Sequence, residues 1–197
     1  IGTNNIETEI LNGEARAYGL ELLFRKNFGK FKGWFAYTLS KSEQRALGGN
    51  AGGPGINDGN WYNTPFDRTH DISVTGSYDF NDKWKFSANF VYQTGRPVTY
   101  PNGQYEYEGL SIASYDERNA NRLPAYHRLD LSATFTPSKN KNRRWQSEWV
   151  FGLYNAYARR NAASISFTQD FDTGINEARR LSIFGSVIPS ITYNFKF

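Results

Sequence analysis

The segment from Arg68 to Phe80 reads RTHDISVTGSYDF. Its even positions from His70 carry His, Ile, Val, Gly, Tyr and Phe, whereas its odd positions from Thr69 to Asp79 are all polar. A period of two over a dozen residues is typical of a β-strand with two unlike faces. The segment is also long enough to cross a membrane, because a tilted barrel strand needs about 9–11 residues.

The same alternation recurs along the chain. It restarts after Asn81-Asp82, where Trp84, Phe86, Ala88, Phe90 and Tyr92 share one face. Further strands are predicted at Ala15 to Asn27, Phe31 to Lys41, His127 to Phe135, Trp145 to Asn155 and over the last residues up to Phe197. Helical spacing fits none of these runs, so the sequence predicts an all-β, antiparallel chain.

The connections between the strands alternate in length. Short polar turns are predicted near Gly29, at Asn81-Asp82 and at Thr136 to Arg144. Long segments are predicted at about 42–66, 94–125 and 156–178. Outer-membrane barrels have short periplasmic turns and long outer loops, with aromatic residues at both interfaces. A soluble β-sandwich, the alternative, has no reason to place all its long loops at one end.

Composition agrees with a membrane barrel. The 197 residues are 39% hydrophobic and 17% aromatic, with mean hydropathy −0.66. No apolar run is long enough for a membrane-spanning helix. The net charge of +4 is too scattered to predict a nucleic-acid partner. The sequence therefore predicts a transmembrane antiparallel β-barrel in a bacterial outer membrane.

Counting back from Phe197 gives seven clear strands, and Ile6 to Leu11 could supply part of an eighth. Single-chain bacterial barrels have an even number of strands. We therefore expect residues 1–197 to be the C-terminal part of a larger barrel domain. A self-contained eight-stranded barrel that acts as an adhesin or structural anchor remains the alternative.

Several motifs resemble those of TonB-dependent outer-membrane transporters of the Bacteroidetes type. They are Gly13–Leu22 (GEARAYGLEL), Phe66–Asp71 (FDRTHD), Tyr92–Pro97 (YQTGRP), Arg122–Asp130 (RLPAYHRLD), Tyr154–Asn161 (YNAYARRN) and Ile188–Phe197 (IPSITYNFKF). The six motifs occur in the right order between Gly13 and Phe197, so the resemblance covers nearly the whole chain.

This resemblance implies that the chain holds the last seven or eight strands of a 22-stranded barrel, without its plug domain and upstream strands. For the intact protein it implies energised uptake of a bulky nutrient such as an oligosaccharide, peptide or siderophore. The implied partners are outer-membrane lipids, the protein's own plug, TonB–ExbB–ExbD, the barrel-assembly machinery and a surface lipoprotein lid. Phe195 and Phe197 resemble the terminal signal that the assembly machinery reads, although both could simply be interface aromatics.

Charged and amide side chains on the polar faces are predicted to face the lumen. They are Glu21, Arg25, Lys85, Asn89, Arg128, Asp130 and Glu148. They could line a water-filled channel or bind a plug, or they could form a closed network in a narrow barrel.

Ligand binding is predicted for the long loops, where aromatic faces lie beside hydrogen-bonding groups. The candidate residues are Trp61, Tyr62, Arg96, Tyr100, Tyr105 and Tyr107. These side chains could instead pack the loops together or form the outer aromatic row.

No enzyme activity, cofactor or metal is predicted. Strand parity places His70 and His127 on the face opposite Asp71 and Asp130, so neither histidine shares a proton network with its neighbouring acid. An outer-membrane hydrolase remains a third hypothesis. No cysteine is present. The two loop segments with oxygen ligands, Asn57–Asn60 and Asp170–Gly174, both lack the spacing of a calcium loop.

Overall fold

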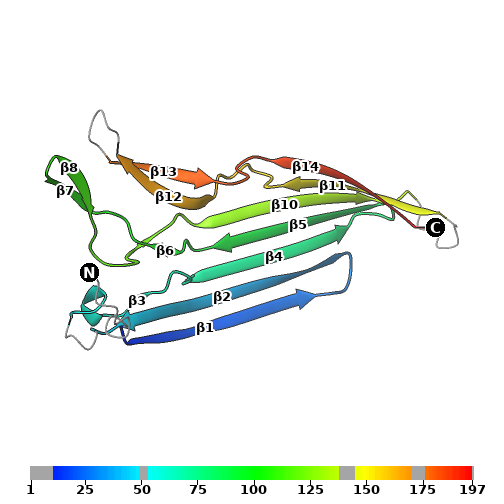
Figure 1. Cartoon of the computed structure of the whole chain (residues 1–197). Coiled ribbons are helices and arrows are strands. Elements are labelled where there is room, and N and C mark those ends of the chain that lie inside the picture. The colour runs from blue at the N-terminus through cyan, green and yellow to red at the C-terminus, as the bar shows by residue number, and fades with distance from the viewer. Residues whose placement is uncertain (1–10, 49–52, 138–144, 170–175, 197) are drawn as a thin grey trace.

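The computed structural model describes residues 11–48, 53–137, 145–169 and 176–196. Seven long strands form one antiparallel sheet in the order β1-β2-β4-β5-β10-β11-β14 (Figure 1). Their bounds are β1 Gly13–Lys26, β2 Phe31–Ala46, β4 His70–Asp79, β5 Trp84–Gln93, β10 Tyr126–Phe135, β11 Gln146–Tyr154 and β14 Ile188–Lys196. The prediction of an all-β, antiparallel chain is confirmed.

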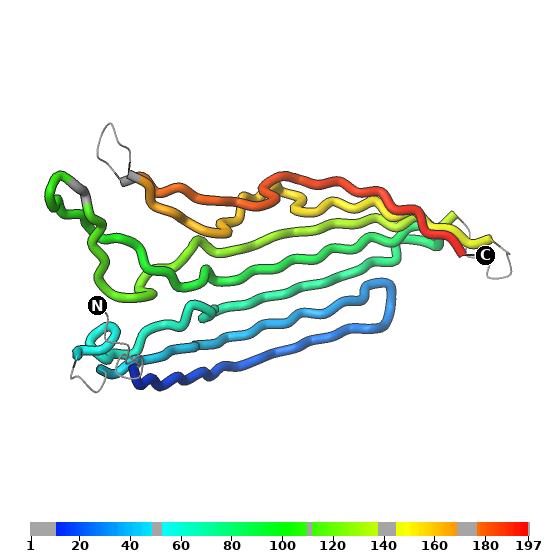
Figure 2. The backbone as a smooth tube through the Cα atoms, viewed as in Figure 1, coloured from blue at the N-terminus to red at the C-terminus, as the bar shows by residue number. Residues whose placement is uncertain are grey.

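Neighbouring long strands follow one another in sequence order, apart from short elements inserted between them, so the sheet is a meander. The β1–β2 and β4–β5 connections lie at one end of the sheet, called here the turn end (Figure 2). Gly29 adopts φ +77° in the first of them, a conformation that glycine reaches without strain. In the second, the Asn81 side-chain oxygen accepts hydrogen bonds from the backbone N–H groups of Lys83 and Trp84, both at 2.8 Å.

The long connections gather at the opposite end, the loop end (Figure 1). The segment after β2 contains a 3-10 turn, η1 (Asn57–Gly59), and β3 (Tyr62–Asn63), which pairs with β2. The segment after β5 contains β6 (Pro97–Val98) paired with β9 (Asn121–Arg122), and β7 (Gly103–Tyr107) paired with β8 (Leu110–Ser114). The segment after β11 contains the β12 (Ala162–Gln169) and β13 (Asn176–Ser182) ribbon.

Two expectations about these connections were wrong, and a third is not tested. Strand β2 continues past Lys41 to Ala46, because Ser42–Ala46 pair with Gly13–Ala17 of β1. The segments at 94–125 and 156–178 are not simple loops, because each contains paired ribbons. Residues 6–10, which belong to the segment proposed as part of an eighth strand, lie outside the described residues.

The long sheet has no buried apolar core within the described residues. The buried apolar residues there are Ala46, Tyr62 and Leu123, and all three lie near the loop end. No helix among the residues described is long and apolar enough to cross a membrane.

Candidate functional site

One face of the sheet, called the apolar face, is continuous across all seven long strands. Strand register places Leu22 beside Tyr37, and Tyr37 beside Ile72. Ile72 lies beside Tyr92, which in turn lies beside His127. The same face continues through Leu131, Leu153, Phe151 and Ile191 to β14. Side chains that alternate in sequence therefore form one apolar surface.

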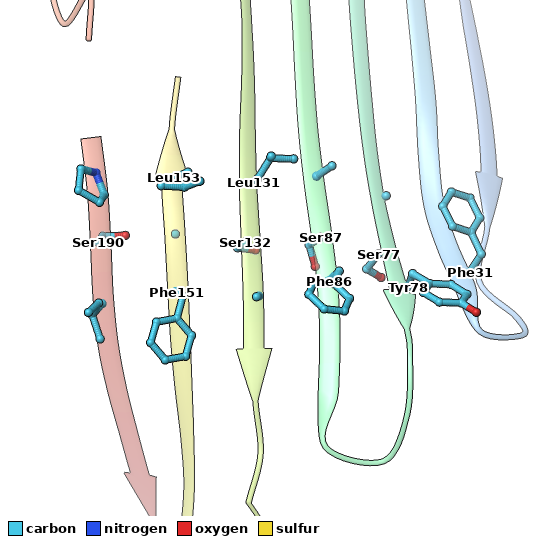
Figure 3. Close-up of a pocket in the computed structure, with 16 residues that line it drawn as sticks. Phe31, Ser77, Tyr78, Phe86, Ser87, Leu131, Ser132, Phe151, Leu153 and Ser190 are labelled. Carbon is cyan, nitrogen blue, oxygen red and sulfur yellow. The ribbon is translucent and has the colours of Figure 1, made fainter. Parts of the chain in front are cut away.

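A shallow hollow of about 650 Å³ lies on this apolar face (Figure 3). Gly76, Ala88 and Ala133 are among its smallest lining residues, and larger apolar groups surround them. The larger groups are Phe31, Tyr78, Phe86, Leu131, Phe151, Leu153 and Ile191. Phe31 lies over Gly76, where an added Cβ would be 3.3 Å from the ring.

The opposite, polar face carries all seven side chains predicted to face a lumen, and its apolar exceptions include Leu23, Trp34, Val91, Val150 and Ile188. Glu21 lies opposite Thr38 and Arg25 opposite Trp34. Lys85 lies opposite Asp79.

The remaining predicted side chains of the polar face have explicit partners. Asn89 accepts a hydrogen bond from Thr75 at 2.8 Å, and Glu148 accepts one from Asn194 at 2.9 Å. Arg128 donates to Asp130 at 3.0 Å and to the Tyr154 hydroxyl at 2.7 Å. The polar face is therefore an ordered surface of hydrogen-bonded side chains.

A buried ion pair joins three loop-end segments. Asp67 is 1% exposed and accepts hydrogen bonds from Arg122 and, at 2.6 Å, from the backbone N–H of Ser42. The Arg122 guanidinium also donates to the Gly95 carbonyl at 3.0 Å and to the Asp67 carbonyl at 3.4 Å. Gly95 leaves no room for a side chain, since a Cβ would lie 1.6 Å from the Leu123 carbonyl oxygen.

A second buried side chain, Asn155, is 1% exposed and joins the segments after β11 and before β14. Its amide nitrogen donates to the carbonyls of Arg159, Phe184 and Ser186 at 3.1 to 3.3 Å. Its backbone N–H donates to Asp130 at 2.9 Å, which connects this cluster to the polar face.

The six predicted ligand residues do not converge on one site. Trp61 lies under two guanidinium groups, at 4.2 Å from Arg16 and 5.0 Å from Arg45. Tyr62 is buried and accepts a hydrogen bond from Gln44 at 3.2 Å. Tyr105 and Tyr107 are exposed on β7.

The other two predicted ligand residues line two separate hollows at the loop end. Tyr100 belongs to a hollow of about 720 Å³ that also contains Asp58, Asp116 and Glu117. The Tyr100 hydroxyl is buried without a hydrogen-bond partner among the described residues, and burial raises the pKa of this phenol. Arg96 belongs to a hollow of about 330 Å³ that also contains Arg68, Gln93 and Tyr126. The two hollows thus have opposite charge.

Both histidines pair with tyrosines and not with acids. The Nδ1 atom of His70 lies 3.0 Å from the Tyr37 hydroxyl, and that of His127 lies 2.7 Å from the Tyr157 hydroxyl. Asp71 accepts a hydrogen bond from Gln93 on the polar face. Across the part of the chain that the structure describes, no three His, Asp or Glu side chains are placed to hold a metal ion.

Phe195, one of the two residues predicted as an assembly signal, stacks on Trp145 with ring centroids 5.1 Å apart. Phe197 lies outside the described residues. Trp145, Trp149, Tyr193 and Phe195 make a row of ring contacts at the turn end of the apolar face.

The buried residues Asp67, Arg122 and Asn155 were not among the candidate site residues. All three lie within quoted motifs, but their roles depend on long-range contacts that local alternation does not encode. The pairing of Asp67 with Arg122 joins positions 55 residues apart.

The chain matches no protein-family model, no curated protein and no solved structure.

Proposed function

We propose that this chain forms part of a bacterial outer-membrane β-barrel, and that the whole protein is a TonB-dependent transporter. The observation that carries the proposal is the apolar face, which runs uninterrupted across seven strands and is covered by nothing among the described residues. Water is a poor solvent for such a face, whereas lipid is a good one. The hollow at Gly76 and Ala88 would be filled by lipid chains.

The dimensions of the apolar face fit a bilayer. On β5, Trp84 lies near the turn end and Tyr92 near the loop end, eight residue steps apart. This corresponds to about 26 Å along the strand at about 3.3 Å per residue, or about 20 Å across the bilayer at the usual tilt of about 40°. Barrel proteins have an apolar band about 25 Å tall between two aromatic rows.

Aromatic side chains lie at both ends of this band. Trp84 contacts Phe135 at the turn end, with ring centroids 4.8 Å apart. At the loop end, Tyr92 stacks on His127 at 6.4 Å and Tyr37 stacks on His70 at 6.1 Å. Amphipathic rings favour the two interfaces of a membrane, so these rows would mark its boundaries.

The two edges of the sheet favour a larger barrel over the self-contained eight-stranded alternative. β1 and β14 each pair on one side only among the described residues, and their side chains are exposed throughout. Barrels remove unpaired edges by closure. Closure through strands elsewhere in the same protein would satisfy both edges and leave room for a plug against the polar face.

The transporter assignment rests on the motifs that resemble this family. Three of them, FDRTHD, YQTGRP and RLPAYHRLD, contribute Asp67, Gly95 and Arg122 to the same buried cluster. Three motifs that are far apart in sequence thus meet in one buried cluster. This is expected if the motifs resemble those of the family because they form the same contacts.

For the intact protein the proposal implies uptake of a bulky nutrient, with energy supplied through TonB–ExbB–ExbD. The barrel-assembly machinery would insert the barrel, and a surface lipoprotein would cover its loop end. No catalytic step is part of this proposal.

Single-cysteine labelling tests the membrane part, because this chain has no cysteine of its own. Leu131→Cys and Ser132→Cys are neighbours on β10 with opposite faces. In intact membranes a water-soluble maleimide should label Ser132→Cys in an aqueous lumen and leave Leu131→Cys unmodified. Equal labelling of both positions would reject a membrane-spanning strand here.

Uptake measurements test the transporter part. Cells that express the full-length protein should accumulate its nutrient only when TonB is present. Growth or uptake that is unchanged after loss of TonB would contradict this assignment and leave the membrane barrel in place.

A further inference from the structure

The smaller of the two loop-end hollows is rich in guanidinium groups. It has a volume of about 330 Å³ and lies where Gln93 of β5 and Tyr126 of β10 end the polar face. Arg68 and Arg96 both line it, and no Asp or Glu is among its lining residues. The hollow therefore carries two positive charges without a negative charge in its lining.

Neither arginine has a strong partner. Arg68 donates to the Thr94 carbonyl at 3.3 Å, and Arg96 donates to the Ala163 carbonyl at 3.4 Å. Both contacts are long, and both acceptors are neutral. Within the described ranges neither arginine forms an ion pair, whereas Arg122 and Arg128 nearby are each paired with an aspartate.

The backbone beneath the two arginines is held by a single side chain. Arg122 donates to the carbonyls of Asp67 and Gly95, the residues that immediately precede Arg68 and Arg96. The buried Asp67–Arg122 pair therefore fixes the backbone positions from which the Arg68 and Arg96 side chains extend. Ordering of this kind lowers the entropy lost when a ligand binds.

We propose that Arg68 and Arg96 bind an anionic group of the transported ligand, a carboxylate, sulfate or phosphate. A planar guanidinium matches such an oxyanion with two parallel hydrogen bonds. The hollow lies at the loop end, where Gln93 and Tyr126 end the polar face, so its anion comes from solution and not from a lipid headgroup. The inference rests on the proposed transporter function and narrows its substrates to acidic nutrients.

Ligand-dependent thermal denaturation of the purified full-length protein in detergent tests the site. The probes are inorganic phosphate and glucuronate, with glucose as the neutral match and sodium chloride to keep ionic strength constant. Binding to the folded state raises the denaturation midpoint in a saturable way. We expect saturation with phosphate, glucuronate or both, and no response to glucose.

Arg68→Gln and Arg96→Gln should each weaken the apparent affinity about tenfold or more. Arg179→Gln removes the same charge from β13, where the side chain is 71% exposed, and should leave the affinity unchanged. Because Arg96 is itself exposed, we expect Arg96→Gln to fold. This variant therefore still tests the site if Arg68→Gln does not fold.

Equal responses to glucuronate and glucose together with no saturable phosphate response, or an unchanged affinity in Arg96→Gln, would overturn the anion site. A response to only one of the two anions supports it and identifies the oxyanion. The result is independent of membrane labelling and TonB-dependent uptake, so failure here leaves the proposed transporter function standing.

Discussion

At the scale of single residues, the burial of Asp67 determines how the loop end holds together. Its side chain is fully buried, while that of Arg122 keeps 27% of its surface exposed. Removing one partner of a buried ion pair leaves the other charge without compensation, which is more costly than losing an exposed pair.

We expect Asp67→Asn to lower the free energy of unfolding by about 2–4 kcal/mol. Denaturant titration of the purified full-length protein measures this change. Asp58→Asn, at an exposed carboxylate in η1, is the matched control and should stay within about 0.5 kcal/mol of the parent. Similar losses in both variants would show that the Asp67–Arg122 contact contributes no special stability.

Glu43 gives the loop end a dependence on pH. It lies on β2 beyond the last apolar-face residue of that strand, Leu39, and its carboxylate is 2.7 Å from Arg16 and 3.3 Å from Lys41. The hydrogen bond from Arg16 is the largest influence that holds the pKa of Glu43 below its ordinary value, helped by Lys41 and opposed by burial.

Because this pKa is lowered in the folded state, the stabilisation is present above the unfolded pKa of about 4.3. It is lost as the pH falls through the folded value. Glu43→Gln should therefore lower stability by about 0.5–1 kcal/mol at pH 7 and by less at about pH 3, below the unfolded pKa, where part of the stabilisation has been lost. Denaturation midpoints of both proteins at the two pH values measure the difference; a deficit of equal size at both would argue against ionisation as its cause.

At the scale of elements, β10 offers a direct comparison of the two faces. Leu131 lies on the apolar face and Ser132 on the polar face, with the same neighbouring strands. In the proposed membrane, Leu131→Lys should cost about 2–4 kcal/mol, since a charge near the centre of the lipid face is poorly solvated. Ser132→Lys should be tolerated.

The yield of folded, membrane-inserted protein and its denaturation midpoint check this prediction. A smaller loss for Leu131→Lys than for Ser132→Lys would mean that the assignment of faces is reversed.

The long strands were predictable because each alternates between two unlike environments, as Trp84 to Gln93 does. The ribbon β7–β8 was not predicted, because each of its strands is only five residues long and the alternation from Gln104 to Tyr107 is too short to distinguish from a loop. The outer extension of β2 was missed for a different reason, because Ser42–Arg45 are all polar and show no alternation.

The ligand residues were harder to predict than the strands. Trp61 was a candidate as an aromatic in a long loop, yet it packs against Arg16 and Arg45. The pairing of Arg68 with Arg96 around one hollow depends on the register of β4 and β5 and on the path of the loops. Local sequence patterns contain none of that information.

At the scale of the whole molecule, the separation of β1 from β14 distinguishes the two barrel sizes. Five strands lie between them in the sheet. In a closed eight-stranded barrel these edges would lie within one or two strand spacings, about 5–10 Å. In a larger barrel, β1 and β14 are separated by the width of the five strands between them along the barrel wall.

Paired spin labels at Leu22→Cys and Ile191→Cys of the full-length protein should give a distance of more than about 20 Å, given the five intervening strands at about 4.8 Å each. Both side chains are exposed on the apolar face, so labels should not disturb the polar face. A distance below about 15 Å would support the small barrel, whose edges lie within two strand spacings.

The meander has a consequence for the order in which the protein folds. Each long strand can pair with its sequence neighbour as soon as both are present, and such local contacts form early. The Asp67–Arg122 pair must wait, because it joins residues 55 positions apart and needs Gly95 between them. We therefore expect the hairpins to form first and the contacts of the loop end, including the Asp67–Arg122 pair, to form last. The anion site would then be able to bind its ligand only after the strands of the barrel wall behind it have paired.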